Sequence, residues 1–441
     1  MSKFAILFLL TYTGGIGASI LIDASWGVLL YQADYFLNPS SRWWYSDLPE
    51  IRYSFTIAIF IFLGYFIHKS KYTKNKIFSV PQTKWIILNA LYFLLTTLWA
   101  VWSFIHNQTL ISHLKLLLFL YIAFRVIDNS DKFEKMIWAF LCGNFYLGWV
   151  AHSTGRLFGD RLEAFGPADT GGDGNATASV MISCIPILLF YLLEGKRWQK
   201  IASLGFMAYV IDGVILVNSR GALVGMIVST AYFAFLLLFG SKGVSAKKRM
   251  AIVFVLIIGF SAFIYLTDES FWNRMSTISD EAKSDRGGGG RMFFWKKALD
   301  LAKEHPLGVG VWGYQYLSPQ FIPEELLARG PKGGRRAVHS LFFQCLAERG
   351  YIGILLFISL LISNFRFIWK TKKSLKLRKD FYHYYQASAI EAGFIAFLAA
   401  SVFLNNLYME VLYWFMLYFA LFGTIFSEFR NQEAKNEKQM I

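Results

Sequence analysis

The chain has 441 residues, of which 55% are hydrophobic and 18% are aromatic, and its formal net charge is +15. A soluble globular domain has about 45–50% apolar residues scattered among polar ones, whereas here they form long uncharged blocks such as 252–266 and 352–362. The basic residues fall mainly between these blocks, which argues against nucleic acid as a partner and predicts an all-α integral membrane protein.

The apolar blocks predict twelve membrane-spanning helices, because each supplies the predominantly apolar stretch that a bilayer core requires. No small-residue cleavage site follows the first block, so we expect a retained span and not a removed signal peptide. In chain order the predicted spans cover 4–30, 53–67, 85–105, 113–127, 134–152, 176–193, 201–217, 222–240, 250–267, 340–365, 387–404 and 408–427.

Lysine and arginine residues cluster in four of the connecting loops, at 69–84, 196–200, 242–249 and 366–379. With twelve spans, all four loops fall on one side of the membrane together with both termini, and the positive-inside rule makes that side the cytoplasm. The opposite side then receives a large insertion and the shorter loops at 32–52, 106–112, 153–175, 218–221 and 405–407.

The large insertion is too polar to cross the membrane and divides the chain into three parts. Residues 1–267 hold the first nine spans, 268–338 form the outer loop, and 339–441 hold the last three spans and a short cytoplasmic tail. Helical spacing of apolar residues at 294, 298 and 301 predicts a partly helical loop. Two glycine-rich tracts, at 287–290 and 332–336, are expected to be flexible.

Several arginines on the outer side run against the positive-inside rule and need another explanation. Arg220 lies in the four-residue turn Asn-Ser-Arg-Gly between two spans, close to membrane depth, where an unpaired guanidinium is costly. Arginine suits bidentate binding of phosphate, although snorkelling to lipid headgroups is the alternative for any single one. The outer arginines are Arg156, Arg161, Arg220, Arg286, Arg291, Arg335 and Arg336.

His339 lies where a basic, glycine-rich stretch meets an apolar helix. A histidine in that position can keep a tunable pKa near neutrality, which suits a general base. The alternative is that His339 only ends a helix at the membrane surface. Gln344 and Glu348 lie one helical turn further on and are predicted to hydrogen-bond inside the bundle instead of facing lipid.

No metal site and no cofactor are predicted. The three cysteines lie in apolar blocks without a CxxC pair. Asp169 and Asp173 lie in a glycine-rich stretch that reads as a polar turn and not as a cation site. Residues 308–313 match GxGxxG, but no βαβ pattern surrounds them, which argues against a dinucleotide site.

Several short motifs follow one another in a fixed order along the outer side. They are Arg161…Asn175, Asn218-Ser-Arg220-Gly, Arg291-x-x-x-Trp295, His305-Pro-Leu-Gly-Val-Gly310 and His339-Ser-x-Phe-x-Gln344-x-Leu-Ala-Glu348-x-Gly350. Over about residues 150–365 this ordered set resembles the O-antigen ligase and O-antigen polymerase superfamily of bacterial inner membranes, most closely the lipopolysaccharide O-antigen ligases. The match at Arg161 and Asn175 is looser, because a glycine-rich segment separates the two.

The resemblance implies a glycosyltransferase of the integral-membrane (GT-C-like) architecture, with about twelve spans and a large periplasmic loop between the ninth and tenth. Such an enzyme transfers O-antigen polysaccharide from undecaprenyl diphosphate to the lipid A core oligosaccharide on the periplasmic side, with inversion and without a metal. It implies His339 as the catalytic base, and Arg220, Arg291 and Arg161 as ligands of the diphosphate. Supporting positions would be Arg156, Asn175, Arg336, Gln344 and Glu348.

This chemistry is physically coherent. Fixed arginines can stabilise the charge that develops on a diphosphate leaving group in place of a metal, and a histidine can take the proton of an acceptor hydroxyl. Four alternatives stay open: a polymerase that joins repeat units, an oligosaccharide ligase that acts on protein, and, outside the enzymes, a polysaccharide transporter or flippase and a purely structural or receptor role for the outer loop. Transporters place their key polar residues mid-membrane, whereas the candidates here collect at one surface.

Overall fold

The computed structural model describes residues 1–156, 161–240, 246–267, 269, 271–273, 275–276, 290–324, 327 and 334–439. The described residues form helices and connecting segments without a strand. Arg286 and most of the two predicted glycine-rich tracts, at 287–289 and 332–333, lie outside the described residues.

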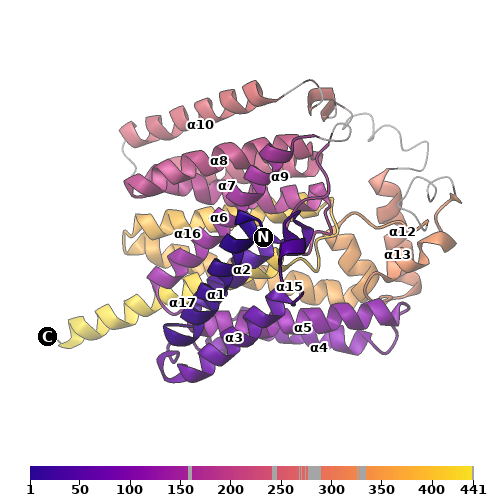
Figure 1. The fold of residues 1–441 in the computed structure, drawn as a ribbon, viewed down its shortest axis with the longest axis horizontal. Helices are drawn as coiled ribbons and strands as arrows, with labels where there is room; N and C mark the ends of the chain where they lie inside the picture. The colour runs from indigo at the N-terminus through magenta and orange to yellow at the C-terminus, as the bar shows by residue number, and fades with distance from the viewer. Residues whose placement is uncertain are drawn as a thin grey trace.

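The helices pack side by side in one bundle, and α12 and α13 lie beyond one end of it (Figure 1). In chain order they are α1 (Lys3–Leu21), α2 (Ser25–Leu37), α3 (Tyr53–Ile67), α4 (Gln82–Thr96), α5 (Ser103–Val126), α6 (Ser130–Thr154), α7 (Gly174–Glu194), α8 (Arg197–Val217), α9 (Arg220–Phe239), α10 (Ala246–Leu266), α12 (Arg291–Glu304), α13 (Gly313–Leu317), α15 (Leu341–Leu377), α16 (Phe381–Ser401) and α17 (Glu410–Gln439).

Six of these helices are long and apolar enough to cross a membrane: α1, α5, α7, α8, α9 and α15. Shorter apolar helices cover Tyr53–Ile67, Ile252–Leu266 and Glu410–Phe426. The all-helical architecture of an integral membrane protein is therefore confirmed for the described residues, whereas the count of twelve spans stays a prediction.

The first predicted span, at 4–30, is wrong because the chain turns back within it. Asp23 interrupts the apolar run, and its carboxylate accepts a hydrogen bond from the N–H of Ser25 at 2.9 Å and pairs with Lys132 at 2.9 Å. The N–H of Ala24 donates to the Tyr72 hydroxyl at 2.9 Å. A carboxylate that must be paired when buried thus ends α1 and starts α2 as an antiparallel hairpin.

This hairpin also separates the two ends of the chain. The N–H of Ser2 donates to Asp47 at 2.6 Å, in the segment between α2 and α3. Near the C-terminus, α17 begins beside Asp169 and runs to Phe426, whose carbonyl accepts a hydrogen bond from Arg378 at 3.0 Å. Ser2 and Phe426 therefore lie at opposite ends of the bundle. The structure differs here from the prediction that both termini lie on one side, because the chain folds back once more at Asp23.

The predicted outer loop at 106–112 is also wrong, since these residues belong to α5. The turn lies instead between Thr96 and Ser103. The run looked like a loop because it is polar, but its polar groups have partners inside the protein. The Nδ1 atom of buried His106, for example, accepts a hydrogen bond from the N–H of Val311 at 3.1 Å.

The centre of the bundle consists of α7, α9 and α16, which approach one another at glycines. A Cβ atom at Gly393 of α16 would lie 2.3 Å from the Ser183 carbonyl oxygen of α7, and one at Gly225 of α9 would lie 2.6 Å from the Ala396 carbonyl oxygen of α16. Small residues permit this close approach of backbones. The contact fixes the beginnings of α7 and α9 relative to the end of α16.

A break in α15 ties the outer segment 305–311 to the bundle. Gly350 has φ 63° inside the helix, and the N–H of Tyr351 donates to the Pro306 carbonyl at 2.9 Å. The break frees the carbonyls of Ala347 and Glu348, which accept from the N–H groups of Val309 at 3.1 Å and Gly310 at 2.9 Å. The glycines of the His-Pro-Leu-Gly-Val-Gly motif therefore serve this close packing.

Candidate functional site

Phe403, which follows α16, brings the beginnings of α9 and α12 together. A Cβ atom at Gly221, next to Arg220, would lie 3.6 Å from the Phe403 side chain. The Arg291 guanidinium, on the first residue of α12, lies 5.4 Å from the centre of the Phe403 ring. Trp295 of α12 stacks on the same ring at 6.1 Å. Phe403 therefore contacts the Arg291 side chain of α12 and lies close to the first turn of α9, which begins at Arg220.

His339 lies on the other side of α12, just before α15. Its ring centroid is 6.3 Å from that of Phe294, and the Arg336 guanidinium lies 5.3 Å from the centre of the same Phe294 ring. The backbone of His339 has φ 54°, a left-handed conformation that costs a residue other than glycine about 1–3 kcal/mol. The surrounding contacts hold it in that conformation, which points its ring toward α12.

The electrostatic surroundings keep His339 neutral. Burial, followed by the positive charges of Arg291 and Arg336, lowers the pKa of His339 to about 4, and Asp173 opposes the shift. Charges from three places thus act on one imidazole: Arg291 at the start of α12, Arg336 in the segment before His339, and Asp173 in the turn before α7. The pKa of His339 is therefore lower than the near-neutral value predicted from the sequence, because burial and two neighbouring cations disfavour the charged imidazole. The imidazole is neutral at neutral pH and can accept a proton, as a general base must.

Three buried polar atoms around His339 have no hydrogen-bond partner among the described residues. They are Nε1 of Trp295, Nε of Arg336 and Oγ of Ser340. A buried donor without a partner costs about 1–3 kcal/mol. All three can donate, so the arrangement favours a ligand rich in acceptor oxygens, such as a phosphate group.

Arg156 and Arg161 hold the end of α8. Arg156 donates to the Ile215 carbonyl at 3.0 Å and the Leu216 carbonyl at 3.3 Å, and Arg161 donates to the Val217 carbonyl at 3.4 Å. These carbonyls immediately precede the turn that carries Arg220. Both arginines therefore support the Arg220 turn, a role that differs from the diphosphate binding predicted for Arg161.

The beginning of α7 is fixed by two carboxylates. Asp173 accepts from the N–H groups of Asn175 at 2.7 Å and Ala176 at 3.2 Å, as an N-cap residue does. Glu163 accepts from the N–H of Gly174 at 2.7 Å and pairs with Arg161 at 3.0 Å. Asn175 thus lies on the first turn of a helix whose cap faces His339.

Gln344 and Glu348 form the predicted hydrogen bond inside the bundle, with the amide nitrogen donating to the carboxylate at 3.2 Å. The Tyr408 hydroxyl donates to the other Glu348 oxygen at 2.6 Å, and the N–H of Leu407 donates to the Gln344 amide oxygen at 3.4 Å. The pair joins the first half of α15 to the segment between α16 and α17, which follows Phe403. The pair therefore fixes the first half of α15, which follows His339, relative to the segment that follows Phe403.

A family model described as O-antigen ligase matches residues 205–358. These residues belong to the O-antigen ligase family. The resemblance predicted from the motifs is thereby confirmed, and the matched residues include Arg220, Arg291, Arg336, His339, Gln344 and Glu348. A search of curated proteins finds no match for the chain.

The match to the O-antigen ligase family over residues 205–358 suggests glycosyl transfer of the ligase or polymerase type, with lipid-linked glycans and membrane lipids as partners. Of the predicted site residues, the structure brings Arg291, Arg336 and His339 together, and Arg220 begins α9 next to Gly221, whose backbone lies close to Phe403. Arg156, Arg161, Asn175, Gln344 and Glu348 hold the elements that carry them.

Sequence reasoning missed Phe403, around which the site is built. A single phenylalanine in an apolar run carries no signal of such a role. Asp173 was assigned to a polar turn, and its effect on His339 required the fold. Trp295 was part of the quoted motif, but its stacking on Phe343 at 5.1 Å and on Phe403 could not be read from spacing.

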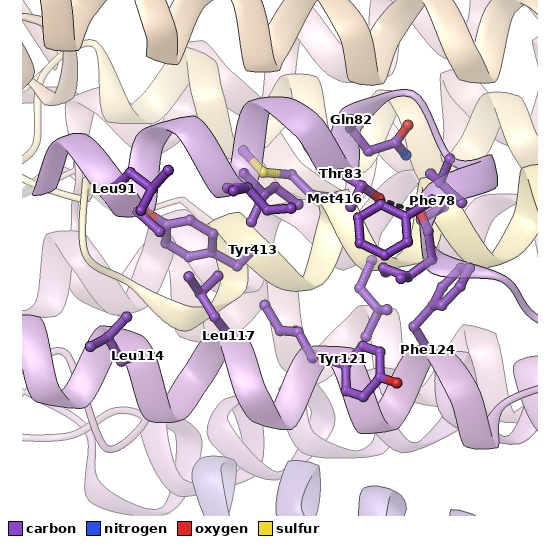
Figure 2. Close-up of a pocket in the computed structure, with 18 of the residues that line it drawn as sticks. Phe78, Gln82, Thr83, Leu91, Leu114, Leu117, Tyr121, Phe124, Tyr413 and Met416 are labelled. Carbon is purple, nitrogen blue, oxygen red and sulfur yellow. Dashed lines mark hydrogen bonds between the residues drawn. The ribbon is translucent and has the colours of Figure 1, made fainter. Parts of the chain in front are cut away.

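The bundle also holds an apolar groove of about 450 Å³ that is separate from these residues. Figure 2 shows it between α4 and α5, with Tyr413 and Met416 of α17 at its back. Its polar lining consists of Gln82, Thr83 and the tyrosine hydroxyls, and Thr83 already donates to the Ile77 carbonyl at 2.6 Å. The groove suits a hydrocarbon chain but offers no charged group to a headgroup.

Proposed function

We propose that the protein transfers O-antigen polysaccharide from undecaprenyl diphosphate to the lipid A core oligosaccharide at the periplasmic face of the bacterial inner membrane. The observation that carries this proposal is the neutral His339 beside Arg291 and Arg336, within the residues that match the family. A base and a set of fixed cations are the two components that displacement of a diphosphate by a hydroxyl requires.

In the proposed reaction, an acceptor hydroxyl oxygen attacks the anomeric carbon of the donor sugar. His339 takes the hydroxyl proton as the new C–O bond forms. The bond between the anomeric carbon and the diphosphate oxygen breaks, and undecaprenyl diphosphate leaves with the electron pair. A single displacement of this kind inverts the anomeric carbon.

Arg220 and Arg291 stabilise the charge that develops on the leaving diphosphate. The two residues begin different helices, α9 and α12, whose first turns both lie close to Phe403, so we propose that they contact separate oxygens of the diphosphate. Because arginines supply this stabilisation, the reaction is proposed to proceed without a metal or another cofactor. The donor's negative charge also offsets the cations that lower the pKa of His339, so His339 becomes a stronger base once the donor is bound.

The basic loops support the proposed orientation. Lys69, Lys71, Lys74 and Lys76 lie between α3 and α4, and Lys370 to Lys379 lie at the far end of α15, opposite to His339. The positive-inside rule places that end in the cytoplasm and His339 on the periplasmic side. This orientation puts the active site on the side where the proposed transfer to the lipid A core takes place.

The test is deletion of the gene in its native host, complementation with variants, and gel analysis of lipopolysaccharide. Complementation with His339→Ala should leave core-only lipopolysaccharide and accumulated lipid-linked polymer. His305→Ala is the matched control, because this exposed histidine follows α12 outside the site. Core with one repeat unit after deletion would indicate a polymerase, and unchanged lipopolysaccharide would argue against both activities.

A further inference from the structure

A second groove, of about 500 Å³, lies on another face of the bundle between α3 and α5. Most of its wall is apolar, but one end carries Arg52, Ser54, Lys115 and Glu410. The groove thus combines a wall suited to hydrocarbon with a charged end. It lies outside the residues that match the family model.

Of the residues that line the charged end, Arg52 and Lys115 are basic and Glu410 is acidic, and behind them the Ser54 hydroxyl donates to buried Asp34 at 2.6 Å. Lys115 lies on the exposed face of α5, and its ammonium group is 5.7 Å from the centre of the Phe55 ring. Among the described residues, neither Lys115 nor Arg52 has a carboxylate within ion-pair distance. Glu410 lines the same end, but its carboxylate accepts a hydrogen bond from Tyr31 at 3.0 Å. Cations facing lipid are costly unless an anion accompanies them.

The charged end lies at the end of the bundle that holds His339. Arg52 precedes α3, in the segment that binds Ser2. The N–H of Glu410 donates to Asp169 at 2.7 Å. Asp169 belongs to the same turn as Asp173, whose charge acts on His339. A lipid headgroup in this groove would therefore lie on the same face as the candidate active site.

We infer that the groove between α3 and α5 binds the acceptor lipid, with Arg52 and Lys115 contacting a phosphate on its headgroup and an acyl chain against the apolar wall. This inference rests on the proposed function, which requires a second lipid besides the diphosphate donor. A phosphorylated, acylated glycolipid matches both the charge and the apolar wall. The groove between α4 and α5 has no cation in its lining, so it offers nothing that would select a phosphorylated lipid over an uncharged one.

The experiment measures binding of a bis-phosphorylated acylated disaccharide, and of its dephosphorylated counterpart, to the full chain in nanodiscs. The wild type should prefer the phosphorylated lipid. Arg52→Gln and Lys115→Gln should each weaken its binding about tenfold, because each removes a charge-assisted contact. The double variant should bind the two lipids equally. Binding of the lipid-linked donor and the unfolding temperature should not change, which shows that the variants are folded.

Lys84→Gln is the matched control, because Lys84 also lies exposed over a ring, 5.2 Å from the centre of the Trp85 ring, at the opposite end of the bundle. It should bind the phosphorylated lipid as the wild type does. Equal binding of the two lipids by the wild type, or an equal loss in Lys84→Gln, would overturn the inference. Because binding is measured without transfer, a wild type that prefers the phosphorylated lipid but transfers nothing refutes the proposed function and supports the groove.

Discussion

The sharpest prediction concerns Arg336, whose charge reaches His339. Both groups lie against the Phe294 ring, at 5.3 and 6.3 Å from its centre, so they are at most about 12 Å apart. At that distance, and at an effective dielectric constant of about 20–40, a unit charge contributes roughly 0.7–1.4 kcal/mol. That energy corresponds to about half to one pH unit in the pKa of His339.

Arg336→Gln removes a positive charge and should therefore raise the pKa of His339 from about 4. His339 must be neutral to act as a base, so the acidic limb of kcat/KM should move to higher pH by about half to one unit, and activity at pH 5 should fall more than at pH 8. The assay is glycosyl transfer by purified protein across about pH 4 to 9.

Arg335→Gln is the control. The Arg335 guanidinium lies over Trp102 at 4.6 Å and Tyr316 at 5.2 Å instead of facing His339. This variant should leave the acidic limb in place. If the limb does not move in Arg336→Gln, or moves to lower pH, the acidic limb does not report His339, and its role as a base is refuted.

Three further substitutions distinguish residues that bind the donor from residues that hold the site or the fold in place. Arg291→Lys should lower donor affinity and turnover together by about tenfold or more, because an ammonium group lacks the planar guanidinium that binds two oxygens at once. Donor binding and single-turnover rates measure this, and an effect on turnover alone would contradict it. Phe403→Leu should lower kcat/KM while Phe403→Tyr retains it, since the ring supports Arg291; equal activities would contradict that support. Gly350→Ala should lower the free energy of unfolding by about 2–4 kcal/mol in a thermal unfolding assay, because its φ is 63° and a Cβ would lie 2.2 Å from the Pro306 carbonyl. Gly259→Ala is the control: a Cβ at Gly259 meets open space, so this variant should unfold as the wild type does.

Apolar periodicity was sufficient to predict most helices, because each buries or presents to lipid a continuous apolar surface. It failed where one polar residue decides the local structure. Asp23 turns the chain within an apolar run, and His106 stays inside a helix because Val311 is its partner. Both outcomes depend on contacts with segments distant in sequence, which periodicity does not contain.

In the candidate site, too, some features could be predicted from the sequence and others depended on contacts between distant segments. The junction at His339 and the outer position of Arg220 and Arg291 follow from the order of polar and apolar segments. The meeting of α9 and α12 at Phe403 depends on how α16 packs on its neighbours, through Gly225 and Gly393. No spacing within one segment specifies such a meeting.

The break in α15 has a consequence for how the protein can be taken apart or recombined. The hydrogen bonds of Val309, Gly310 and Tyr351 make the outer segment and the helix each other's backbone partners. An excised outer region would leave those groups unsatisfied, and so would the helix that lost it. A chimera that receives the outer region of another enzyme therefore needs that enzyme's matching helix turn as well, because each supplies the other's backbone hydrogen-bond partners.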